Sequence, residues 1–542
     1  MPQLTRRHFL QQSSAASLAG LGIHSASAES SAPIETIYSN DTTHIFSCLR
    51  LKTRRESTFS DERFIKSITE ASEVDAHFLQ PGLGWIPWWK SEIYSVADHY
   101  QWLQETHGVK GVDKISQYLL DGGDLLETLV KTCKPLNVKP FISFRLNDGH
   151  HVGDLAEALK QGRPTVKMSR HYWDNYESFR IGSDLKNWDD AVFDWSIPEV
   201  RDYKFALIEE ACSNYDLAGL ELDFLRHWVR FKAETSLEER QDITTEFVVR
   251  IRKMLDRTGA SRNLPRRHLC IRVPANSKVR PEQGINLAAL SAAGVDMINL
   301  SNSYFTWQDK SVATAREEAG DQVAVYLEMT HCTMTGKATN GSGTQPYLRT
   351  TDEHFYTTAM LAYEQGASGV SLFNFPYYRY HVTDDIGPFH EPPFHVLTQL
   401  KDRRFLREQA PSYFLSSGRR DRILGERTLP AILNRKEDYT FEILVSEKMK
   451  VAADGTLRLR SDESIGDRKI EVRCGKTALK AIAFVEKPIP HPYDDTWLGS
   501  NEDTVCFSFP QALIKGKESA GITIRILAGI RVRLIYLDLT FP

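Results

Sequence analysis

Two carboxylates spaced two residues apart are the strongest indication of chemistry in this sequence. Glu221 and Asp223 lie in the apolar run from 217 to 224 (LAGLELDF), which has the composition of a buried strand. Since successive side chains of a strand point to opposite faces, both share one face with Gly219. A buried carboxylate is costly unless it has a partner or a function. The pair therefore indicates acid–base chemistry, and the alternative is a structural ion pair between Glu221 and Arg272.

Hydrolysis of a glycosidic bond is the reaction that two such groups suit best. It needs two carboxyl groups beside the bond, one protonated and one ionised. Glu328 lies in another apolar run, from 323 to 330, and is a candidate for the second group. The predicted roles are nucleophile or base for Asp223 and general acid for Glu328 or Glu221. An ion pair without a catalytic role is the alternative for Glu328 too.

Polar and aromatic side chains follow the other apolar runs. Several Arg and His residues among them suit a sulfated or uronate sugar. Trp85, with Trp88 and Trp89 nearby, is either a platform for sugar rings or part of the core. The candidate substrate-binding residues are Arg145, His150, His151, Arg226, His227, Arg272, Asn276, Asn302, Tyr304, Asn374, Tyr378 and Trp85.

The elements that position these residues are eight apolar runs separated by helical stretches. The runs cover 43–51, 74–80, 140–147, 217–224, 268–273, 295–303, 323–330 and 369–375. Eight strand-then-helix units predict an α/β fold, a (β/α)₈ TIM barrel, in which chemistry gathers at the C-terminal ends of the strands. A doubly wound open sheet is the alternative, but no Gly-rich phosphate turn follows an early strand.

The pattern changes from about residue 411. Short runs such as TFEILVS, KIEVRC and VRLIYLDL are separated by Gly, Asp, Asn and Pro, which predicts an all-β sandwich. The predicted division is a signal peptide at 1–28, a linker at 29–42, a catalytic barrel at 43–408 and an accessory β-sandwich at 409–542.

The N-terminal residues have the pattern of an export signal. Arg6 and Arg7, within TRRHFL, resemble the twin-arginine motif. An apolar stretch from 15 to 23 and the small residues at 26–28 complete a signal peptide. No later stretch reaches the roughly 18 apolar residues of a membrane span. We expect bacterial export to the periplasm or the exterior, without membrane attachment after cleavage.

Composition excludes several classes of partner. A formal net charge of -4 and the lack of a basic face argue against nucleic acid. The seven Cys show neither CxxC nor Cys/His ligand spacing, so most are expected to be small buried residues. No cofactor is expected, and the predicted partner is a polysaccharide or oligosaccharide substrate.

The segment GLELDFLRH, from Gly219 to His227, resembles the fourth-strand motif of several glycosidase barrels. It is most similar to the glycosyl-hydrolase-like barrels of the family-10-like (DUF187-type) group, whose fourth strand reads roughly Asp-Gly-x-x-x-Asp-Tyr-x-Arg. The resemblance implies a barrel over about 43–406 and places Asp223 and Arg226 at the family's acidic and basic positions.

Three departures prevent a complete catalytic pair from being carried over. The chitinase-type motif has an acid where this chain has Leu225, and the α-amylase-type motif has Arg where this chain has Glu221. The commonest retaining pattern has Asn before a fourth-strand acid, where this chain has Leu220. The main prediction is a glycoside hydrolase acting on an extracellular polysaccharide. Its rivals are a non-catalytic carbohydrate-binding barrel and a metal-dependent hydrolase using His150, His151 and Asp223.

Overall fold

The computed structural model describes most of the chain from residue 33 onward. The described residues are 33–46, 48–49, 59–225, 227–335, 347–379, 391–417, 428–461, 463–465, 469–485, 502–529 and 531–542. The predicted signal peptide and Arg226 lie outside them, so both stay predictions.

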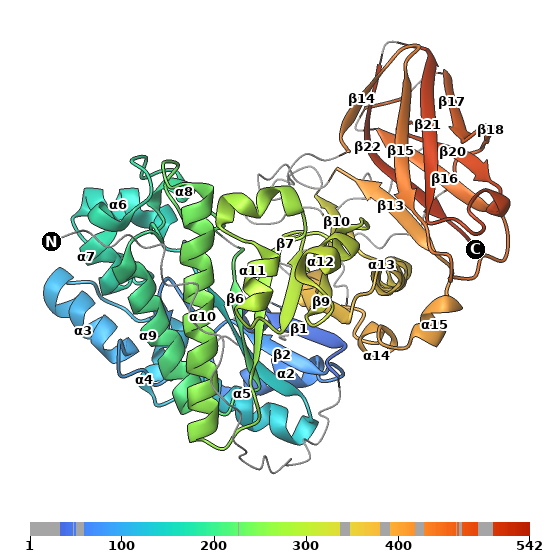
Figure 1. Cartoon of the computed structure of the whole chain (residues 1–542). Coiled ribbons are helices and arrows are strands. Elements are labelled where there is room, and N and C mark those ends of the chain that lie inside the picture. Colours follow the sequence, from blue (N-terminus) through green and yellow to red (C-terminus); the bar gives the residue numbers. More distant parts are fainter. Residues whose placement is uncertain are drawn as a thin grey trace, which may run out of the picture. The chain divides into compact units, whose positions relative to one another are not determined.

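Eight parallel strands close into a barrel (Figure 1). In ring order they are β1 (Thr36–Asn40), β2 (Ala76–Leu79), β5 (Lys139–Arg145), β6 (Gly219–Asp223), β7 (His268–Pro274), β8 (Met297–Ser301), β9 (Ala324–Thr330) and β12 (Gly369–Phe373). The last strand pairs with the first, with Tyr38 opposite Leu372. The predicted TIM barrel is confirmed.

The first strand lies earlier than predicted. The run from 43 to 51 does not form it, since Thr43–Phe46 is the short helix α1. The strand is β1, inside the predicted linker, and all five of its residues are buried. A five-residue strand buried on both faces shows no alternation, so the longer apolar run downstream was mistaken for it. Residues 40 and 41 therefore lie at the C-terminal end of a strand.

Helices pack around the strands in Figure 1. They are α2 (Asp61–Glu70), α3 (Val96–His107), α4 (Lys114–Leu120), α5 (Leu125–Cys133), α6 (Leu155–Gln161), α7 (Arg170–Phe179), α8 (Trp188–Ala191), α9 (Pro198–Asn214), α10 (Leu237–Ser261), α11 (Leu287–Ala292), α12 (Ser311–Ala319), α13 (Asp352–Glu364), α14 (Val396–Gln399) and α15 (Arg403–Arg407). Local chemistry starts many of them: the Ser236 side chain accepts from Glu239 N at the start of α10, and Pro198 occupies the first turn of α9. The last helical segment of the barrel consists of two short helices, α14 and α15.

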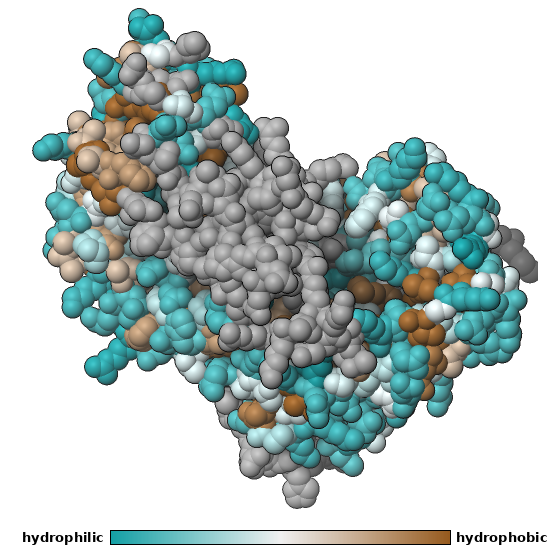
Figure 2. Space-filling model, turned by 180° about the vertical axis from the view of Figure 1, so that it is seen from behind, coloured by the Kyte–Doolittle hydropathy of each residue, from teal (hydrophilic) through white to brown (hydrophobic). Residues whose placement is uncertain are grey.

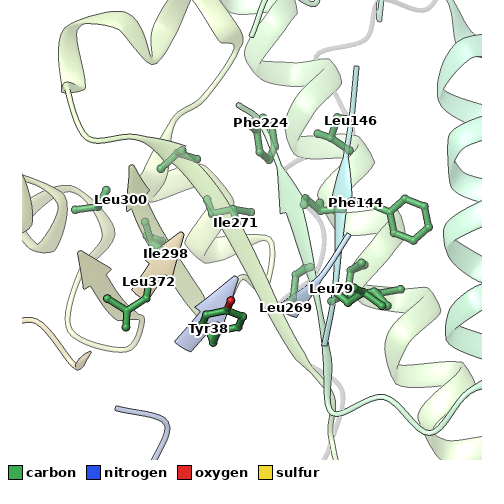
Figure 3. Packing of buried hydrophobic residues seen from close by; sticks show 14 of the residues in the cluster. Tyr38, Leu79, Phe144, Leu146, Phe224, Leu269, Ile271, Ile298, Leu300 and Leu372 are labelled. Carbon is green, nitrogen blue, oxygen red and sulfur yellow. The ribbon is translucent and has the colours of Figure 1, made fainter. Parts of the chain in front are cut away.

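Alternate residues of the strands face outward, toward the helices. Figure 3 shows this layer, with Leu269 and Ile271 from β7 beside Ile298 and Leu300 from β8. All four side chains are fully buried, so the outward faces supply most of the hydrophobic stabilisation of the barrel.

The inward residues form two different layers. At the N-terminal end of the strands the lumen is apolar, with Ile37, Phe78, Phe141, Met297 and Tyr326 in one cluster. Gly219 belongs to this layer because a Cβ there would lie 2.1 Å from the Phe141 ring. Further along the same strands the inward residues become polar and charged.

The C-terminal region forms two antiparallel sheets, which confirms the predicted β-sandwich. One contains β13 (Ser412–Ser416), β14 (Ala431–Asn434), β16 (Gly455–Ser461), β19 (Lys480–Ile482), β20 (Thr504–Phe509) and β22 (Arg531–Thr540). The other contains β15 (Asp438–Leu444), β17 (Lys469–Cys474), β18 (Thr477–Ala478) and β21 (Ser519–Ala528). Two small hairpins, β3 (Gly82–Leu83) with β4 (Ile86–Pro87) and β10 (Cys332–Thr335) with β11 (Tyr347–Arg349), lie in barrel loops.

Specific contacts join this region to the barrel. Gln308 donates to the Ser412 carbonyl at 3.1 Å and accepts from Phe414 N at 3.0 Å, and Leu361 of α13 belongs to the sandwich core. Whether the barrel folds without the sandwich stays a prediction.

All seven Cys are buried and unpaired, as expected from their spacing. No helix in the described part of the chain is both long and apolar enough to span a bilayer. The coloured parts of the surface in Figure 2 are mostly hydrophilic, with hydrophobic residues in separate patches.

Candidate active site

Arg272, on β7, joins two of the predicted catalytic carboxylates. Its Nε and Nη2 donate to the two oxygens of Glu328 at 2.6 and 2.8 Å, and its Nη1 donates to Asp223 Oδ1 at 3.1 Å. All three side chains are almost completely buried. Burial opposes the charge of Arg272, but Glu328 and Asp223 together raise its pKa above the usual value. The guanidinium therefore stays charged and fixes both acids in place.

Glu328 is occupied by this ion pair. Besides Arg272, Ser301 Oγ donates to Glu328 Oε1 at 2.5 Å. Burial raises the pKa of Glu328, and the hydrogen bonds from Arg272 oppose that shift. Because Glu328 does not line the cavity described below, the structure favours the ion-pair alternative over a role as general acid.

Glu221 lies deeper in the lumen, two residues before Asp223 on β6. It accepts from Ser143 Oγ at 2.6 Å and from Asn299 Nδ2 at 3.1 Å, and Cys270 Sγ lies 3.5 Å away. Its hydrogen-bond partners among the described residues do not include Arg272, so the predicted direct pair is not formed. Burial, and then the nearby charge of Asp223, raise the pKa of Glu221 to about 7. This carboxyl group is therefore partly protonated at neutral pH.

Asp223 ends β6 and points into the mouth of the barrel. Oδ1 accepts from Leu225 N at 2.9 Å, and Oδ2 lies 3.8 Å from Arg145 Nε. Asp223 therefore has an arginine on each of two sides.

A small cavity of about 10 Å³, close to the size of one water molecule, lies at this end of the barrel. It is lined by residues from six strands or their C-terminal ends, namely Ser39, Asn40, Asp41, Phe78, Gln80, Ser143, Arg145, Glu221, Asp223, Arg272 and Phe373. Glu221 and Asp223 thus face one cavity, together with a third carboxylate, Asp41.

Asp41 is a site residue that the sequence analysis missed. It follows β1, and its carboxylate accepts from Tyr377 Oη at 3.0 Å and lies 3.7 Å from Arg145 Nη2. Arg145 therefore stands between Asp41 and Asp223. Asp41 was missed because the first strand was predicted at the wrong place. Polar residues that follow a barrel strand line the mouth, so the correct strand would have pointed to Asp41.

A second polar group lies beside the mouth, in the loop after β5. His150 bonds to Asp148 through Nδ1, and Gly149 N donates to His227 Nδ1 at 2.9 Å. Burial alone would raise the pKa of Asp148, but the positive charges of His150 and Arg145 hold it well below its usual value. The structure thus brings the predicted residues His150 and His227 together near Arg145.

Trp188 of α8 supplies an exposed aromatic ring at this loop. Its side chain is one of the few large hydrophobic groups exposed in the described chain, at 45%. One ring face stacks on His227, with centroids 5.1 Å apart and planes at 29°. Exposed Trp rings bind the apolar faces of sugars, so Trp188 fits the platform role that the sequence analysis gave to Trp85.

Three predicted binding residues are packed into the protein. Trp85 is 5% exposed and has the Lys204 ammonium 3.8 Å from its ring centroid, so it belongs to the core, which was the alternative. His151 packs edge-on against Tyr172, and neither ring nitrogen has a hydrogen-bond partner in the described chain. Tyr378 donates its hydroxyl to the Thr350 carbonyl. None of the three lines the cavity.

The remaining predicted residues follow β7, β8 and β12. Asn276 accepts from Lys278 N and caps a short 3₁₀ helix, while the Tyr304 carbonyl accepts from Thr330 Oγ1 at 2.7 Å. Asn302 and Asn374 are buried, and the Asn302 Nδ2 and both amide atoms of Asn374 lack a hydrogen-bond partner among the described residues. Neither side chain lines the cavity.

The ligand set of the metal-dependent alternative is not brought together. His151 packs away from the cavity against Tyr172, and Asp223 pairs with Arg272. Within the ranges that the structure describes, no group of three or more His, Cys, Asp or Glu side chains is arranged to hold a metal ion.

Comparisons with known sequences identify no relative: no model of a known protein family and no curated protein matches this chain. Solved structures that are similar to this chain have low identity and TM-scores under 0.5. A chitinase from Paenibacillus sp. str. FPU-7 is 8% identical with a TM-score of 0.39, over 92% of this chain and 52% of its own, so this chain spans about half its length.

Two further matches are of similar quality. The glycoside hydrolase domain of PgaB from Bordetella bronchiseptica is 9% identical with a TM-score of 0.41, over 68% of this chain and 99% of its own. An alpha-L-fucosidase from Bacteroides thetaiotaomicron is 11% identical with a TM-score of 0.35, over 91% and 92%. The structural neighbours are thus glycoside hydrolases, but the fold assignment here rests on the strand order of the barrel itself.

Proposed function

We propose that this protein hydrolyses glycosidic bonds of a polysaccharide at the mouth of the barrel. The observation that carries the proposal is that two carboxyl groups in different environments, Asp223 and Glu221, face one cavity at the catalytic end of β6. Asp223 is paired with Arg272, whereas burial raises the pKa of Glu221 to about 7. One ionised and one protonated carboxyl group is the combination that glycosidic hydrolysis requires.

In the proposed reaction, each of the four buried charged residues has a separate role. Asp223 acts as the nucleophile or base, and its charge stabilises the positive charge that develops on the sugar ring. Glu221 holds the proton for the leaving group. Arg272 orients Asp223, and Glu328 acts through Arg272 as a positioning residue.

Sugar binding is assigned to side chains around the mouth. Trp188 offers an exposed ring face, and Arg145 and His150 offer polar side chains at the mouth. A non-catalytic carbohydrate-binding barrel is the second candidate, because Asp223, Arg272 and Glu328 form a satisfied ion network. Such a barrel would bind sugar without turnover.

One experiment separates the two functions. The purified protein is incubated with a panel of neutral and acidic polysaccharides, and new reducing ends and binding are both measured. The wild type is compared with Asp223→Asn and with Asp202→Asn, an exposed carboxylate of α9 that serves as a control. Turnover lost only in Asp223→Asn supports the proposal, and binding without turnover in all three proteins supports the second candidate.

Export through the twin-arginine route is a further part of the proposal, and it depends on Arg6 and Arg7. Replacing both with Lys should leave unprocessed precursor in the cytoplasm, as seen by fractionation and mass measurement. Arg403→Lys with Arg404→Lys, in α15, is the matched control. Normal cleavage and export of the Arg6/Arg7 double variant would show that the twin-arginine interpretation is wrong.

A further inference from the structure

Asp41 is a carboxylate of the barrel mouth that the proposed mechanism does not use. Its side chain is 12% exposed, whereas those of Asp223 and Glu328 are 4% and 0% exposed. Glu221 is fully buried. Among these four acidic side chains, Asp41 is therefore the one that a molecule arriving from solvent reaches most easily.

Several contacts hold the Asp41 carboxylate in one orientation. Oδ1 accepts from Thr43 N at 3.1 Å, and Oδ2 accepts from Tyr377 Oη at 3.0 Å. Tyr377 follows β12, so its hydroxyl group reaches Asp41 from the strand that pairs with β1. Thr42, the next residue, has a φ of 75°, which is uncommon for a β-branched residue and must be maintained by the surrounding structure. A carboxylate fixed in this way loses little conformational entropy when it binds a ligand.

Two further polar groups that line the same cavity have no hydrogen-bond partner among the described residues. They are Ser39 Oγ and Gln80 Oε1, and both residues are buried, at 6% and 3% exposure. The Gln80 amide is oriented by its Nε2, which donates to the Gly82 carbonyl at 2.7 Å, so Oε1 is left as an acceptor. A buried acceptor without a partner is costly. A ligand that donates a hydrogen bond here would remove that cost.

The size of the cavity limits what can enter it. A volume of about 10 Å³ is close to that of one water molecule. This space excludes a whole sugar ring but admits a single hydroxyl group, which can donate to Asp41 or Gln80 and accept from Ser39. The ring that carries the hydroxyl group stays outside the cavity, on the side where Asp41 is exposed.

The charges around the cavity disfavour a negatively charged group. Three of its lining residues are acidic and two are basic, namely Asp41, Glu221 and Asp223 against Arg145 and Arg272. Arg145 already lies 3.7 Å from Asp41 and 3.8 Å from Asp223. Arg272 donates to Asp223 at 3.1 Å. A sulfate or carboxylate group of a ligand would thus lie among acceptors and like charges, which weakens its binding.

We propose that Asp41 is a specificity-determining residue that binds a hydroxyl group of a neutral sugar, and that the sugar beside it carries neither a carboxylate nor a sulfate group. Gln80 and Ser39 complete the hydrogen bonds of the same hydroxyl group. The identification of the ligand as a sugar rests on the proposed function. The inference replaces the sulfated or uronate sugar that the Arg and His residues suggested, because Arg145 and Arg272 face carboxylates of the protein itself.

The test measures binding by NMR titration of three pairs of sugars that differ in charge. The pairs are glucose with glucuronate, galactose with galacturonate, and N-acetylglucosamine with its 6-sulfate. The wild type is compared with Asp41→Asn, which keeps the shape of the side chain and removes its charge. Asp202→Asn is the control, because Asp202 is an exposed carboxylate of α9.

For at least one pair we expect the wild type and the control to bind the neutral sugar about tenfold more tightly than the acidic one. Asp41→Asn should lose most of that difference. The ratio of the two affinities separates a role in specificity from a structural one, because a variant with a damaged structure weakens both members of a pair equally. Gln80→Met removes the Oε1 acceptor at similar side-chain length and should also weaken the neutral member.

Three results would overturn the inference. The wild type could bind no sugar of the panel, it could bind no neutral member more tightly than its acidic counterpart, or Asp41→Asn could leave the ratio unchanged. If Asp41→Asn does not fold, the wild-type ratio and Gln80→Met decide.

Turnover is measured separately, so the inference and the proposed function can fail independently. Binding of a neutral sugar that depends on Asp41, in a protein inactive on every polysaccharide, would retain the inference and remove the proposed hydrolysis. Turnover of an acidic polysaccharide that depends on Asp223 but not on Asp41 would retain the hydrolysis and remove the inference.

Discussion

The two ends of the barrel lumen are built from the same strands but have opposite characters. The lower layer, with Phe141 and Tyr326, is apolar, whereas the upper layer holds Glu221, Asp223 and Arg272, all buried. Along one strand, inward-facing residues two or four positions apart belong to different layers: the earlier ones to the apolar core, and the later ones to the candidate site. The lower layer contributes hydrophobic burial, and the upper layer keeps charges in place only because each has a partner.

The largest effect on activity is expected from a substitution of Asp223 in the upper layer. Replacing it with Asn should reduce turnover by about 10³-fold or more, because the ionised group is lost. Thermal stability should change little, since Arg272 keeps both hydrogen bonds to Glu328. The measurement is reducing-end release together with thermal unfolding. Near-normal turnover in a destabilised variant would show that Asp223 serves only as an ion-pair partner.

The lower layer should respond in the opposite way. Phe141→Ala removes a fully buried ring that stacks on Phe78 at 4.3 Å between centroids. The expected loss is about 3–5 kcal/mol of unfolding free energy, measured by urea denaturation. Activity per folded molecule should stay close to that of the wild type. A large loss of turnover in fully folded Phe141→Ala would mean that the two layers are coupled.

Glu221 makes the difference between the layers depend on pH. Its pKa is about 7 in the folded protein against 4.5 for the ordinary group, so unfolding between these values releases a proton. The stability that this group contributes is complete below pH 4.5, decreases as pH rises, and is lost above about 7, a change of about 3 kcal/mol.

Glu221→Gln should therefore flatten the stability profile between pH 4.5 and 7, measured by thermal unfolding at a series of pH values. On the hydrolysis side, Glu221→Gln should lose less turnover on substrates with an activated leaving group, which needs no protonation. If only Glu328→Gln shows that dependence on the leaving group, Glu328 is the general acid and Glu221 is not.

Substitution of the exposed Trp188, outside both layers of the lumen, should have the smallest effect on activity. Trp188→Ala removes an exposed ring and leaves the carboxylates untouched, so it should raise KM by about tenfold with kcat little changed. Trp85→Phe is the informative counterpart, because Trp85 is buried under Lys204 and should affect stability more than KM. An unchanged KM in Trp188→Ala would remove Trp188 from the sugar-binding surface.

Much of this arrangement could be predicted because it follows local periodicity. The alternation of strands and helices predicted the barrel, and the period of two placed Glu221 and Asp223 on one inward face. Strand ends directed attention to Arg145 and Arg272, which line the cavity, and to the loop containing His150, whose role stays a prediction. The first strand was misplaced because a short strand buried on both faces lacks alternation, and Asp41 was missed with it.

What the sequence by itself determined is therefore which residues stand at the catalytic end of each strand, since chain direction and side-chain alternation are local properties. Only the tertiary structure decided how those residues divide their roles. Glu328 and Asp223 both lie beside Arg272, and Trp85 packs into the core while Trp188 is exposed. These outcomes depend on distances between strands and loops far apart in the chain, which set burial and pairing and therefore the charge of each group.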